Sequence, residues 1–386
     1  MLEKAISSTS ENGLNIGIDA RCLEWQRGGV ANYLLNLLKG LPDLVKQSKI
    51  FLYFENSIPS DAFLHNSIFQ LRIVTGPRLI KINPTLSYLF LMSREAKRDN
   101  IDLFFATWYC SPFCMGKIKT VVAAWDISYT THPSHFPFKA SLITSILSKK
   151  SCRESEGVIT CSEYDARQIS KYYGINRDDI CVVSLAADDR FNDKLSDEQI
   201  SSFRLKYNLP GKYILSFGAI YNRRNVDIII KSFCLIRNRY PEFGLVVVGK
   251  NSTHPPIDIP EIISPLISEK RGVYIERIGD AELPYLYQSA YAYICTSTVD
   301  GETIQLKEAM KSGIPVITSP LLEQTIGGNG FIINDPTSVE QTSKVLSQIM
   351  DLNGEFDELV LSGIRWNNSI SWKSITQTTY NFLVTR

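Results

Sequence analysis

Residues 213–236, "YILSFGAIYNRRNVDIIIKSFCLI", decide the fold. The stretch begins with a short apolar run, passes through a turn that contains two arginines, and continues with apolar residues at helical spacing. An apolar, β-rich run followed by an amphipathic helix is typical of a strand–helix–strand unit. Such units build parallel sheets that helices cover. This stretch therefore predicts a parallel α/β domain.

The same alternation continues on both sides of this stretch. Helices of the first half are expected to begin near residues 30, 86, 140 and 164. The expected strands lie at residues 14–20, 50–55, 71–76, 101–106, 120–125 and 157–162, and then at 213–219, 245–250, 273–278, 290–297, 315–319 and 330–335. The sequence thus predicts the α/β class, with one Rossmann-like sheet in each half.

A domain boundary is expected at residues 186–211, where the apolar periodicity is lost and charged and turn-forming residues accumulate. The length of 386 residues suits two or three domains. The predicted parts are a disordered lead-in at 1–13, an N-terminal domain at 14–190, a C-terminal domain at 191–365 and a final helix at 366–386.

The composition excludes several classes of protein. Hydrophobic residues make up 44% of the chain and charged residues 21%, as in globular proteins and unlike disordered ones. The net charge is +1, so no overall field favours nucleic acid. The apolar runs are too short to span a membrane, and residues 1–13 lack the apolar core of a signal peptide. The eight cysteines show no metal-binding spacing, so we expect reduced thiols in a cytoplasmic protein without a metal site.

Two strand-to-helix turns are candidate anion sites. Gly28 and Gly29 precede a predicted helix, where a phosphate can approach the backbone N–H groups of the helix start. The alternative is a tight turn with a structural role alone. Arg223 and Arg224 follow a predicted strand, and their charge and fork geometry suit a diphosphate. A solvated surface pair is the alternative there.

A third turn is rich in acidic residues. Asp300, Glu302 and Glu308 lie in a stretch that follows the strand predicted at 290–297 and runs into the helix predicted at 306–313. Carboxylates at a helix start complement the helix dipole, which is a structural reason for their presence. Near a sugar, the same groups accept hydrogen bonds from hydroxyls. Both interpretations remain open on the residues alone.

From about residue 14 to residue 380 the chain resembles the family 4 glycosyltransferases. The resemblance rests on the order of seven stretches: "IGIDAR", "GGVANYLLNLLKGLPDL", "VVAAWDISYTTHPSHFP", "GVITCSEYDARQI", "ILSFGAIYNRRNVD", "LPYLYQSAYAYICTSTVDGE" and "LKEAMKSGIPVIT", followed by "GGNGFIINDP". It implies the GT-B architecture, in which two Rossmann-like domains face a central cleft and the C-terminal helix crosses back to the first domain. It also implies a retaining enzyme that uses a nucleotide-diphosphate sugar.

The resemblance also implies roles for individual residues. Asp126, Arg223, Arg224 and Asp300 match catalytic positions, and the arginine pair takes the place that a metal has in other enzymes. The implied donor-binding positions are Gly28, Gly29, Gly218, Arg223, Arg224, Ile278, Asp300, Glu302, Thr303, Ile304 and Glu308. Among them, Asp300 is expected near the sugar hydroxyls and Glu308 near the ribose. Trp108, Tyr109 and Trp125 are expected on the acceptor side, with buried packing as the alternative.

Three positions depart from the family pattern. Trp125 stands where His is usual, Asp300 replaces Glu, and Thr303 replaces Gly. These departures leave open that the sugar differs, that Glu302 substitutes for Asp300, or that donor binding is weakened. A degenerate glycosyltransferase that serves as a partner or scaffold, and a GT-B nucleotide-sugar epimerase, are the alternatives.

The function expected from the resemblance is a metal-independent hexosyltransferase of surface polysaccharide biosynthesis. It would take mannose from GDP-mannose, or a hexose from a UDP-hexose, to a glycan or lipid-linked glycan acceptor, without a cofactor. Residues 78–98 combine basic and apolar side chains, which suits peripheral contact with an anionic membrane surface at its inner face. A core-facing helix with a solvated basic end is the alternative for that segment.

Overall fold

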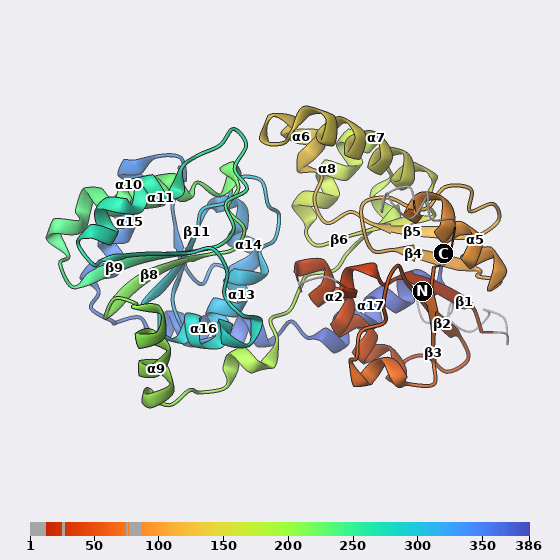
Figure 1. Cartoon of the computed structure of the whole chain (residues 1–386), viewed down its shortest axis with the longest axis horizontal. Coiled ribbons are helices and arrows are strands. Elements are labelled where there is room, and N and C mark those ends of the chain that lie inside the picture. Colours follow the sequence, from red (N-terminus) through yellow and green to blue (C-terminus); the bar gives the residue numbers. More distant parts are fainter. Residues whose placement is uncertain (1–12, 25–27, 75, 77–86) are drawn as a thin grey trace. The chain divides into compact units, whose positions relative to one another are not determined.

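The computed structural model describes residues 13–24, 28–74, 76 and 87–386. The chain divides into two compact units, drawn in Figure 1. Unit 1 comprises Met1–Ile127, Leu142–Ser184 and Trp372–Arg386, and unit 2 comprises Ser128–Ser141 and Leu185–Ser371. The lead-in predicted at residues 1–13 lies outside the described residues except for Gly13.

Unit 1 is built on a seven-stranded parallel sheet with the order β3-β2-β1-β4-β5-β6-β7. The strands are β1 (Asn15–Asp19), β2 (Lys49–Phe54), β3 (Phe69–Ile73), β4 (Leu103–Ala106), β5 (Lys119–Ala123), β6 (Gly157–Thr160) and β7 (Ile180–Val182). In the central register, Ile16 of β1 lies opposite Ile50 of β2 and Leu103 of β4. Six of these strands were predicted, and β7, which has three residues, was not.

The helices around this sheet include the last helix of the chain. They are α2 (Gly29–Gly40), α5 (Met92–Arg98), α8 (Glu163–Tyr173), α17 (Trp372–Val384) and most of α7 (Phe138–Glu154). The short α6 (Ser128–Thr131) and the first four residues of α7 are assigned to unit 2. Helix α17 packs on α2, where the hydroxyls of Tyr33 and Thr379 are 2.9 Å apart. Ile375 and Leu383 are buried in the same contact region. The final helix therefore belongs to unit 1, although it follows unit 2 in the chain.

Unit 2 repeats the architecture with six parallel strands in the order β10-β9-β8-β11-β12-β13. The strands are β8 (Lys212–Phe217), β9 (Phe243–Val248), β10 (Gly272–Ile275), β11 (Ala292–Cys295), β12 (Val316–Thr318) and β13 (Phe331–Ile332). The helices are α9 (Asp197–Tyr207), α10 (Val226–Ile236), α11 (Ile259–Ser268), α12 (Leu283–Gln288), α13 (Ile304–Lys311), α14 (Glu323–Ile326), α15 (Val339–Asp351) and α16 (Asp357–Asn368). All six predicted strands are present.

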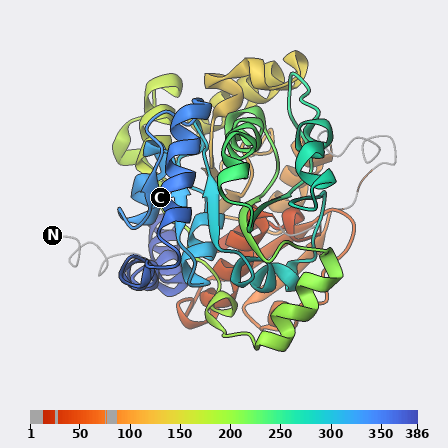
Figure 2. The same cartoon turned by 90° about the vertical axis from the view of Figure 1, so that its left-hand side faces the viewer.

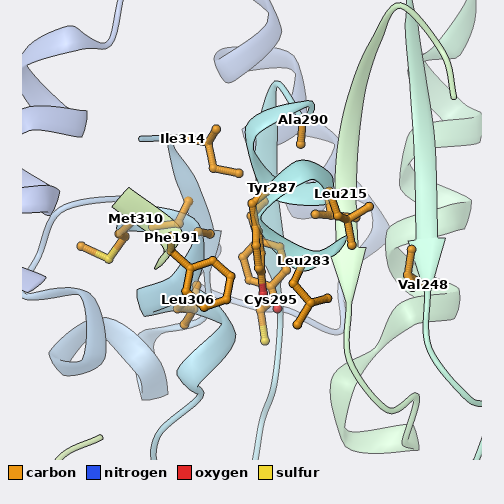
Figure 3. Packing of buried hydrophobic residues seen from close by; sticks show 14 of the residues in the cluster. Phe191, Leu215, Val248, Leu283, Tyr287, Ala290, Cys295, Leu306, Met310 and Ile314 are labelled. Carbon is orange, nitrogen blue, oxygen red and sulfur yellow. The ribbon is translucent and has the colours of Figure 1, made fainter. Parts of the chain in front are cut away.

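Both faces of the unit 2 sheet are buried. Alternate residues of β8 point into different clusters: Leu215 packs with Tyr287 and the α13 side, and Ile214 packs with the α10 and α11 side. Figure 2 shows helices on both sides of this sheet, and Figure 3 shows Leu215, Tyr287 and Leu306 in the first cluster. A parallel sheet covered in this way needs strands that are apolar on both faces. This requirement explains the near-continuous apolar runs in the sequence.

The segment predicted as a boundary, residues 186–211, contains helix α9. A capping box of Ser196 and Gln199 starts this helix, and its only buried side chain is Phe203. Lys311 Nζ donates to the carbonyl of Ala187 at 3.2 Å, which ties the segment to unit 2. A single buried apolar residue leaves little periodicity in the sequence, so the helix was not expected there.

The described part of the segment 78–98 forms a short π-helical turn (Ser87–Leu91) and α5. Tyr88, Leu89, Leu91 and Met92 are buried in unit 1, and Phe90 is exposed. Residues 78–86 lie outside the described residues. Among the helices that are described, none is both long enough and apolar enough to cross a membrane.

Candidate functional site

The strand order of unit 2 reverses between β8 and β11, because the chain continues outward from β8 on one side and from β11 on the other. In open parallel sheets, ligands bind beyond the carboxyl ends of the strands at this point. The segment after β8 carries Gly218, Arg223 and Arg224, and the segment after β11 carries Asp300 and Thr303. The sheet topology therefore brings these predicted residues to one edge.

Hydrogen bonds fasten the two segments to each other. The Thr298 N–H donates to the Arg223 carbonyl, and the Thr296 hydroxyl donates to the Arg224 carbonyl, both at 2.9 Å. The side-chain amide of Asn225 donates to the Thr296 carbonyl, also at 2.9 Å. Asn225 has a φ of +51°, a left-handed conformation that Asn tolerates better than most residues. The arginine pair is thus held at fixed positions on the sheet edge.

The carboxylate of Asp300 binds both arginines. Arg223 Nε donates to Oδ1 at 2.7 Å, and Arg224 Nε lies 3.4 Å from Oδ2. The Ser297 hydroxyl donates to Oδ2 at 2.9 Å. The three charged side chains are between 9% and 15% exposed, so this is a nearly buried cluster with two positive charges and one negative charge. The resulting excess of positive charge suits an anionic ligand.

Burial and charge act in opposite directions on this cluster. Burial alone would raise the pKa of the Asp300 carboxyl, but Arg223 and Arg224 outweigh it and hold that pKa below its ordinary value. Burial would lower the pKa of Arg224, but Asp300 together with smaller contributions from neighbouring Cys and Tyr side chains outweighs burial and raises that pKa. All three groups therefore remain charged at neutral pH.

Gly218 lies directly against Arg224. Its φ is +124°, a conformation that side-chain-bearing residues rarely adopt, and a Cβ there would lie 2.1 Å from Arg224 Nη1. The Gln305 side chain would lie 3.6 Å from the same Cβ. Gly218, Arg224 and Gln305 therefore meet at this edge. The sequence did not single out Gln305, because nothing local marks a first-turn glutamine as close to the arginines.

The amino end of α13 faces this edge without a side-chain cap. Thr303 occupies the N-cap position, but its hydroxyl makes no capping bond. The residue is 2% exposed, and its Oγ1 has no hydrogen-bond partner among the described residues. Uncapped helix starts bind anions through their N–H groups and the helix dipole. Ile304, the first residue of α13, is buried there.

Glu302 has partners that explain its presence without a ligand. Its Oε2 accepts a hydrogen bond from the Leu185 N–H at 2.8 Å, and its Oε1 is 2.5 Å from Lys307 Nζ. Both side chains are nearly inaccessible, at 4% and 1%. Lys307 also donates to the Leu185 carbonyl. The Glu302 carboxylate thus binds the backbone of Leu185, the residue at which the main segment of unit 2 begins. Nothing in the local sequence marks Leu185 as the partner of Glu302.

Glu308 lies in the second turn of α13 and is 5% exposed. Tyr287 donates its hydroxyl to Glu308 Oε2 at 2.8 Å. Burial raises the pKa of the Glu308 carboxyl from 4.5 to about 7, although the Tyr287 hydrogen bond and Arg190 act in the opposite direction. Ile278, which follows β10, is partly buried against the apolar cluster that contains Tyr287. The structure thus gives Glu308 a carboxyl that titrates near neutral pH.

In unit 1 the glycine pair begins helix α2. Gly28 is the N-cap, no side chain caps this helix, and Gly29 is its first residue. Both glycines are exposed, and a Cβ at either position would meet no atom within 4 Å. Packing among the described residues therefore does not require glycine at either position. An open, uncapped helix start is consistent with an anion site but also with a simple turn.

The three predicted acceptor-side aromatics differ in burial. Trp125 is 9% exposed, donates from its indole N–H to the Thr107 carbonyl at 3.1 Å, and packs against Tyr33 at 4.5 Å between ring centres. Trp108 is 38% exposed and lies edge-on to Tyr109 at 5.4 Å. Asp126 follows β5 and is half-buried. Trp125 thus packs inside unit 1, while the Trp108 side chain is partly exposed to solvent.

The carboxyl end of β1 carries another buried ion pair. Arg21 binds Asp19 through two hydrogen bonds, Nε to Oδ1 at 2.9 Å and Nη2 to Oδ2 at 3.0 Å. The Arg21 guanidinium also lies 3.7 Å from the centre of the Tyr88 ring. The "IGIDAR" stretch therefore ends in a cation that the Asp19 carboxylate and the Tyr88 ring hold in place. Spacing in the sequence did not identify this pair as part of a site.

Within the described residues, no cluster of three or more His, Cys, Asp or Glu side chains is arranged to hold a metal ion. All eight cysteines are free thiols. The polar groups at the edge of the unit 2 sheet are mainly cationic and amide donors, which favour anions over metal cations.

Two family models match the chain. The one described as "Glycosyltransferase Family 4" matches residues 27–191, and the one described as "Glycosyl transferases group 1" matches residues 211–351. The chain is 23% identical to the O-antigen chain mannosyltransferase B of Escherichia coli over 270 residues, which are 68% of this chain and 69% of that protein. It spans less than half the length of several other curated relatives.

Solved structures share the fold over nearly the whole chain. WaaG, a glycosyltransferase involved in lipopolysaccharide biosynthesis, has a TM-score of 0.70 at 14% identity, covering 95% of this chain and 99% of its own. HepE of Anabaena, solved in complex with UDP-glucose, has a TM-score of 0.69 at 17% identity, covering 97% of this chain and 100% of its own. The predicted α/β class and GT-B fold are confirmed.

Proposed function

Because the chain belongs to the family 4 glycosyltransferases, we propose that it transfers a hexosyl group from a nucleotide-diphosphate sugar to a glycan in surface polysaccharide synthesis. The mannosyltransferase of Escherichia coli supports mannose as the sugar, and GDP-mannose is the donor we propose. The UDP-glucose complex of HepE supports a UDP-hexose as the alternative. The acceptor is a glycan or a lipid-linked glycan.

The observation that carries this proposal is the cluster of Arg223, Arg224 and Asp300 at the strand reversal of unit 2. Two guanidinium groups with one carboxylate leave a net positive charge in a nearly buried place. The uncapped start of α13 adds N–H donors beside them. A diphosphate carries the charge and the oxygen geometry to bind both the two arginines and the N–H groups of α13. Glu308 would then accept hydrogen bonds from the ribose hydroxyls.

The proposed reaction breaks the bond between the anomeric carbon and the diphosphate oxygen, whose electron pair remains with the diphosphate. The acceptor hydroxyl oxygen forms the new bond on the same face, so configuration is retained, and its proton passes to the leaving phosphate. Arg223, Arg224 and the α13 N–H groups stabilise the charge that develops on the diphosphate, because they are already oriented toward it. The reaction we propose needs no metal ion and no cofactor.

We propose different tasks for the acidic residues of the turn. Asp300 orients the two arginines, since both donate to its carboxylate. Glu302 is engaged by Lys307 and Leu185, so we do not propose that it replaces Asp300 at the sugar. In unit 1 we propose that Gly28, Gly29 and Asp126 serve the transfer step and that Trp108 and Tyr109 contact the acceptor. Trp125 supports that region by packing on Tyr33.

A thermal-shift screen tests the donor site. We expect GDP-mannose and GDP to raise the unfolding midpoint, because a ligand at ten times its dissociation constant stabilises the native state by about 1.4 kcal/mol. UDP-glucose, UDP-N-acetylglucosamine and UDP are the comparison ligands. Arg224→Gln should remove the shift. Arg239→Gln is the matched control, since Arg239 is an arginine of unit 2 that is 65% exposed and also pairs with an aspartate.

Two outcomes would contradict the proposal. One is the absence of a shift with all five ligands. The other is a shift that Arg224→Gln leaves intact, which would place the nucleotide elsewhere. A shift with UDP-glucose alone would keep the transferase and replace the proposed donor. Release of free nucleotide from the donor in the presence of excess EDTA then tests metal independence, and activity that EDTA abolishes would contradict it.

A further inference from the structure

The sheet of unit 1 has a strand reversal of its own. The chain runs outward from β1 through β2 to β3 on one side and from β4 to β7 on the other, so the order reverses between β1 and β4. Ligands of open parallel sheets bind beyond the carboxyl ends of the strands at such a point. Arg21 follows β1, Glu55 follows β2 and Trp108 follows β4, so all three lie at this carboxyl edge. The topology therefore gives unit 1 a place for a ligand.

Glu55 is the residue at this edge that the protein itself does not explain. It is 6% exposed, yet its carboxylate makes no hydrogen bond with any residue that the structure describes. Only the backbone is fastened, because the N–H groups of Glu55 and Asn56 donate to the Glu24 carboxylate. A carboxylate can accept several hydrogen bonds, and burying one without a partner is costly. Glu55 therefore points to a ligand that supplies hydrogen-bond donors.

Arg21 is the donor beside this carboxylate. Asp19 binds its Nε and Nη2, which leaves Nη1 without a hydrogen bond among the described residues. Burial lowers the pKa of the guanidinium, but Asp19 and, to a smaller extent, Tyr88 and Glu55 outweigh burial and raise that pKa. Arg21 is therefore charged at neutral pH, and Glu55 lies near enough to act on it. The edge thus presents a fixed donor next to an acceptor.

A guanidinium next to a carboxylate suits the neighbouring hydroxyl groups of a sugar. A hydroxyl both donates and accepts, so one can donate to Glu55 while the next accepts from Arg21. Aromatic rings at the same edge offer a surface for the apolar face of a sugar ring: Trp108 is 38% exposed and lies edge-on to Tyr109 at 5.4 Å. A few polar groups beside an aromatic surface are typical of a small-molecule site.

The charge of this edge distinguishes between classes of sugar. Arg21 is the only basic residue in the first five positions after β1, β2, β4 and β5, all of which the structure describes. The acidic residues in the same positions are Glu24, Glu55 and Asp126. The Arg21 charge is also balanced by Asp19, its partner in the ion pair. A uronic acid or a sugar phosphate would therefore meet a net negative charge, which an uncharged sugar does not feel.

We propose that Glu55 and Arg21 bind the hydroxyl groups of an uncharged acceptor sugar at the carboxyl edge of the unit 1 sheet, and that they select against acidic sugars. The end of the acceptor that this chain extends is then a neutral sugar. The inference rests on the proposed transferase function and deepens it, because it names the class of the acceptor end. Glu55 has no partner in the protein because the substrate supplies one.

Saturation-transfer NMR with the full chain and no donor measures sugar binding directly. Methyl glycosides of mannose, glucose and galactose are the neutral probes. Their acidic counterparts are mannose 6-phosphate, methyl glucuronide and methyl galacturonide. We expect at least one neutral probe to bind, and to bind about five-fold more tightly than its acidic counterpart, because the acidic group is repelled at the carboxyl edge.

Glu55→Gln keeps the shape of the side chain and removes its charge. The neutral probe should bind about ten-fold more weakly, because a hydrogen bond to a carboxylate becomes one to a neutral amide. The preference for neutral over acidic probes should also disappear. Without sugar, the variant should unfold about 2 °C above the parent, since a nearly buried carboxylate without a partner destabilises the free protein. A purely structural role for Glu55 would give the opposite change in stability.

Glu95→Gln is the matched control in unit 1. Glu95 is also 6% exposed, but it pairs with Arg94 and Arg98 on α5. This variant should bind the probes as the parent does and should gain no stability. Arg21→Lys keeps the positive charge but loses the fork of donors, and we expect it to bind the neutral probe about five-fold more weakly.

Three results would overturn the inference. The first is that no neutral probe binds the parent protein. The second is that acidic probes bind as tightly as neutral ones. The third is that Glu55→Gln binds the sugar unchanged or unfolds below the parent. The thermal shift with GDP reports on the donor site separately. An intact shift without sugar binding would count against this inference alone, and sugar binding that depends on Glu55 without any shift would count against the donor site alone.

Discussion

Replacing Asp300 by Asn is expected to lower the free energy of unfolding by about 3 kcal/mol. The carboxylate is the shared partner of Arg223 and Arg224, and all three side chains are nearly buried. Asn has almost the same shape but no charge, so two guanidinium groups would remain close together without a counter-ion. Removing one partner of a buried ion pair costs more than the pair itself contributes, because the remaining charge is desolvated and unpaired. Urea unfolding at neutral pH measures the difference.

Asp351→Asn is the matched control for this substitution. Asp351 also pairs with an arginine, Arg239, but the two side chains are 50% and 65% exposed. A solvated pair contributes at most about 1 kcal/mol, so this variant should unfold close to the parent. Equal destabilisation of the two variants would contradict the view that the Asp300 cluster is special.

Inorganic pyrophosphate connects this stability effect to the proposed donor site. In the Asp300→Asn protein, a bound diphosphate would supply the negative charge that the arginines have lost. We therefore expect pyrophosphate to raise the unfolding midpoint of this variant more than that of the parent. A smaller rise in the variant would mean that the anion does not bind at Arg223 and Arg224.

The sequence predicted the strands and their order of appearance because parallel sheets leave a strong local signal. Strands buried on both faces must be apolar throughout, as β8 and β9 are. The signal failed where elements are weakly packed: one of the three residues of β7 is buried, and α9 buries only Phe203. Elements held by a few distant contacts leave no periodicity to detect.

Only half of the candidate site could be derived in the same way. The positions after β8 and β11 follow from topology, since the carboxyl ends of neighbouring parallel strands share an edge. The partners do not follow, because they join residues far apart in the chain. Asp300 meets an arginine 77 positions away, and Glu302 meets the Leu185 N–H 117 positions away. These pairings distinguish Asp300, which binds the two arginines, from Glu302, which binds the backbone of Leu185.

Burial bears on two other questions that the sequence had left open. Trp125 was equally compatible with an acceptor surface and with packing, and its hydrogen bond to the Thr107 carbonyl together with its contact to Tyr33 supports packing. The apolar residues at 88–92 suited a membrane or a core, and most of them are buried. An amphipathic pattern predicts that a helix has an apolar and a polar face, but it does not show which face packs against the protein. Helix α7 exposes large apolar side chains such as Ile143 and Ile146 and buries small polar ones such as Ser148 and Ser151.

Glu308→Gln is expected to stabilise the protein at pH 8 and to have little effect at pH 5. Burial raises the pKa of the Glu308 carboxyl to about 7, above its ordinary value of 4.5 in the unfolded chain. The folded state therefore holds this proton more tightly, and its contribution to stability is fully present below pH 4.5. It is lost as the pH rises through 7, where an enclosed carboxylate must ionise. The loss amounts to about 3 kcal/mol above pH 7.

Gln removes this titration and keeps an oxygen that accepts the Tyr287 hydrogen bond. Urea unfolding of both proteins from pH 5 to pH 8 should show a gap that widens with pH in favour of the variant. Glu276→Gln, at an exposed position after β10, is the control for the loss of a carboxylate. A constant gap for Glu308→Gln would contradict the raised pKa.

The same carboxyl links pH to donor binding. If ribose hydroxyls donate to Glu308, the nucleotide binds the ionised form more tightly, and the affinity of the parent should rise about ten-fold between pH 6 and pH 8. Titration calorimetry in buffers of different ionisation enthalpy would also detect a proton released on binding at pH 6. In Glu308→Gln the affinity should be lower at pH 8 and nearly independent of pH. An equal pH dependence in both proteins would place the ribose away from Glu308, while the effect on stability would stand.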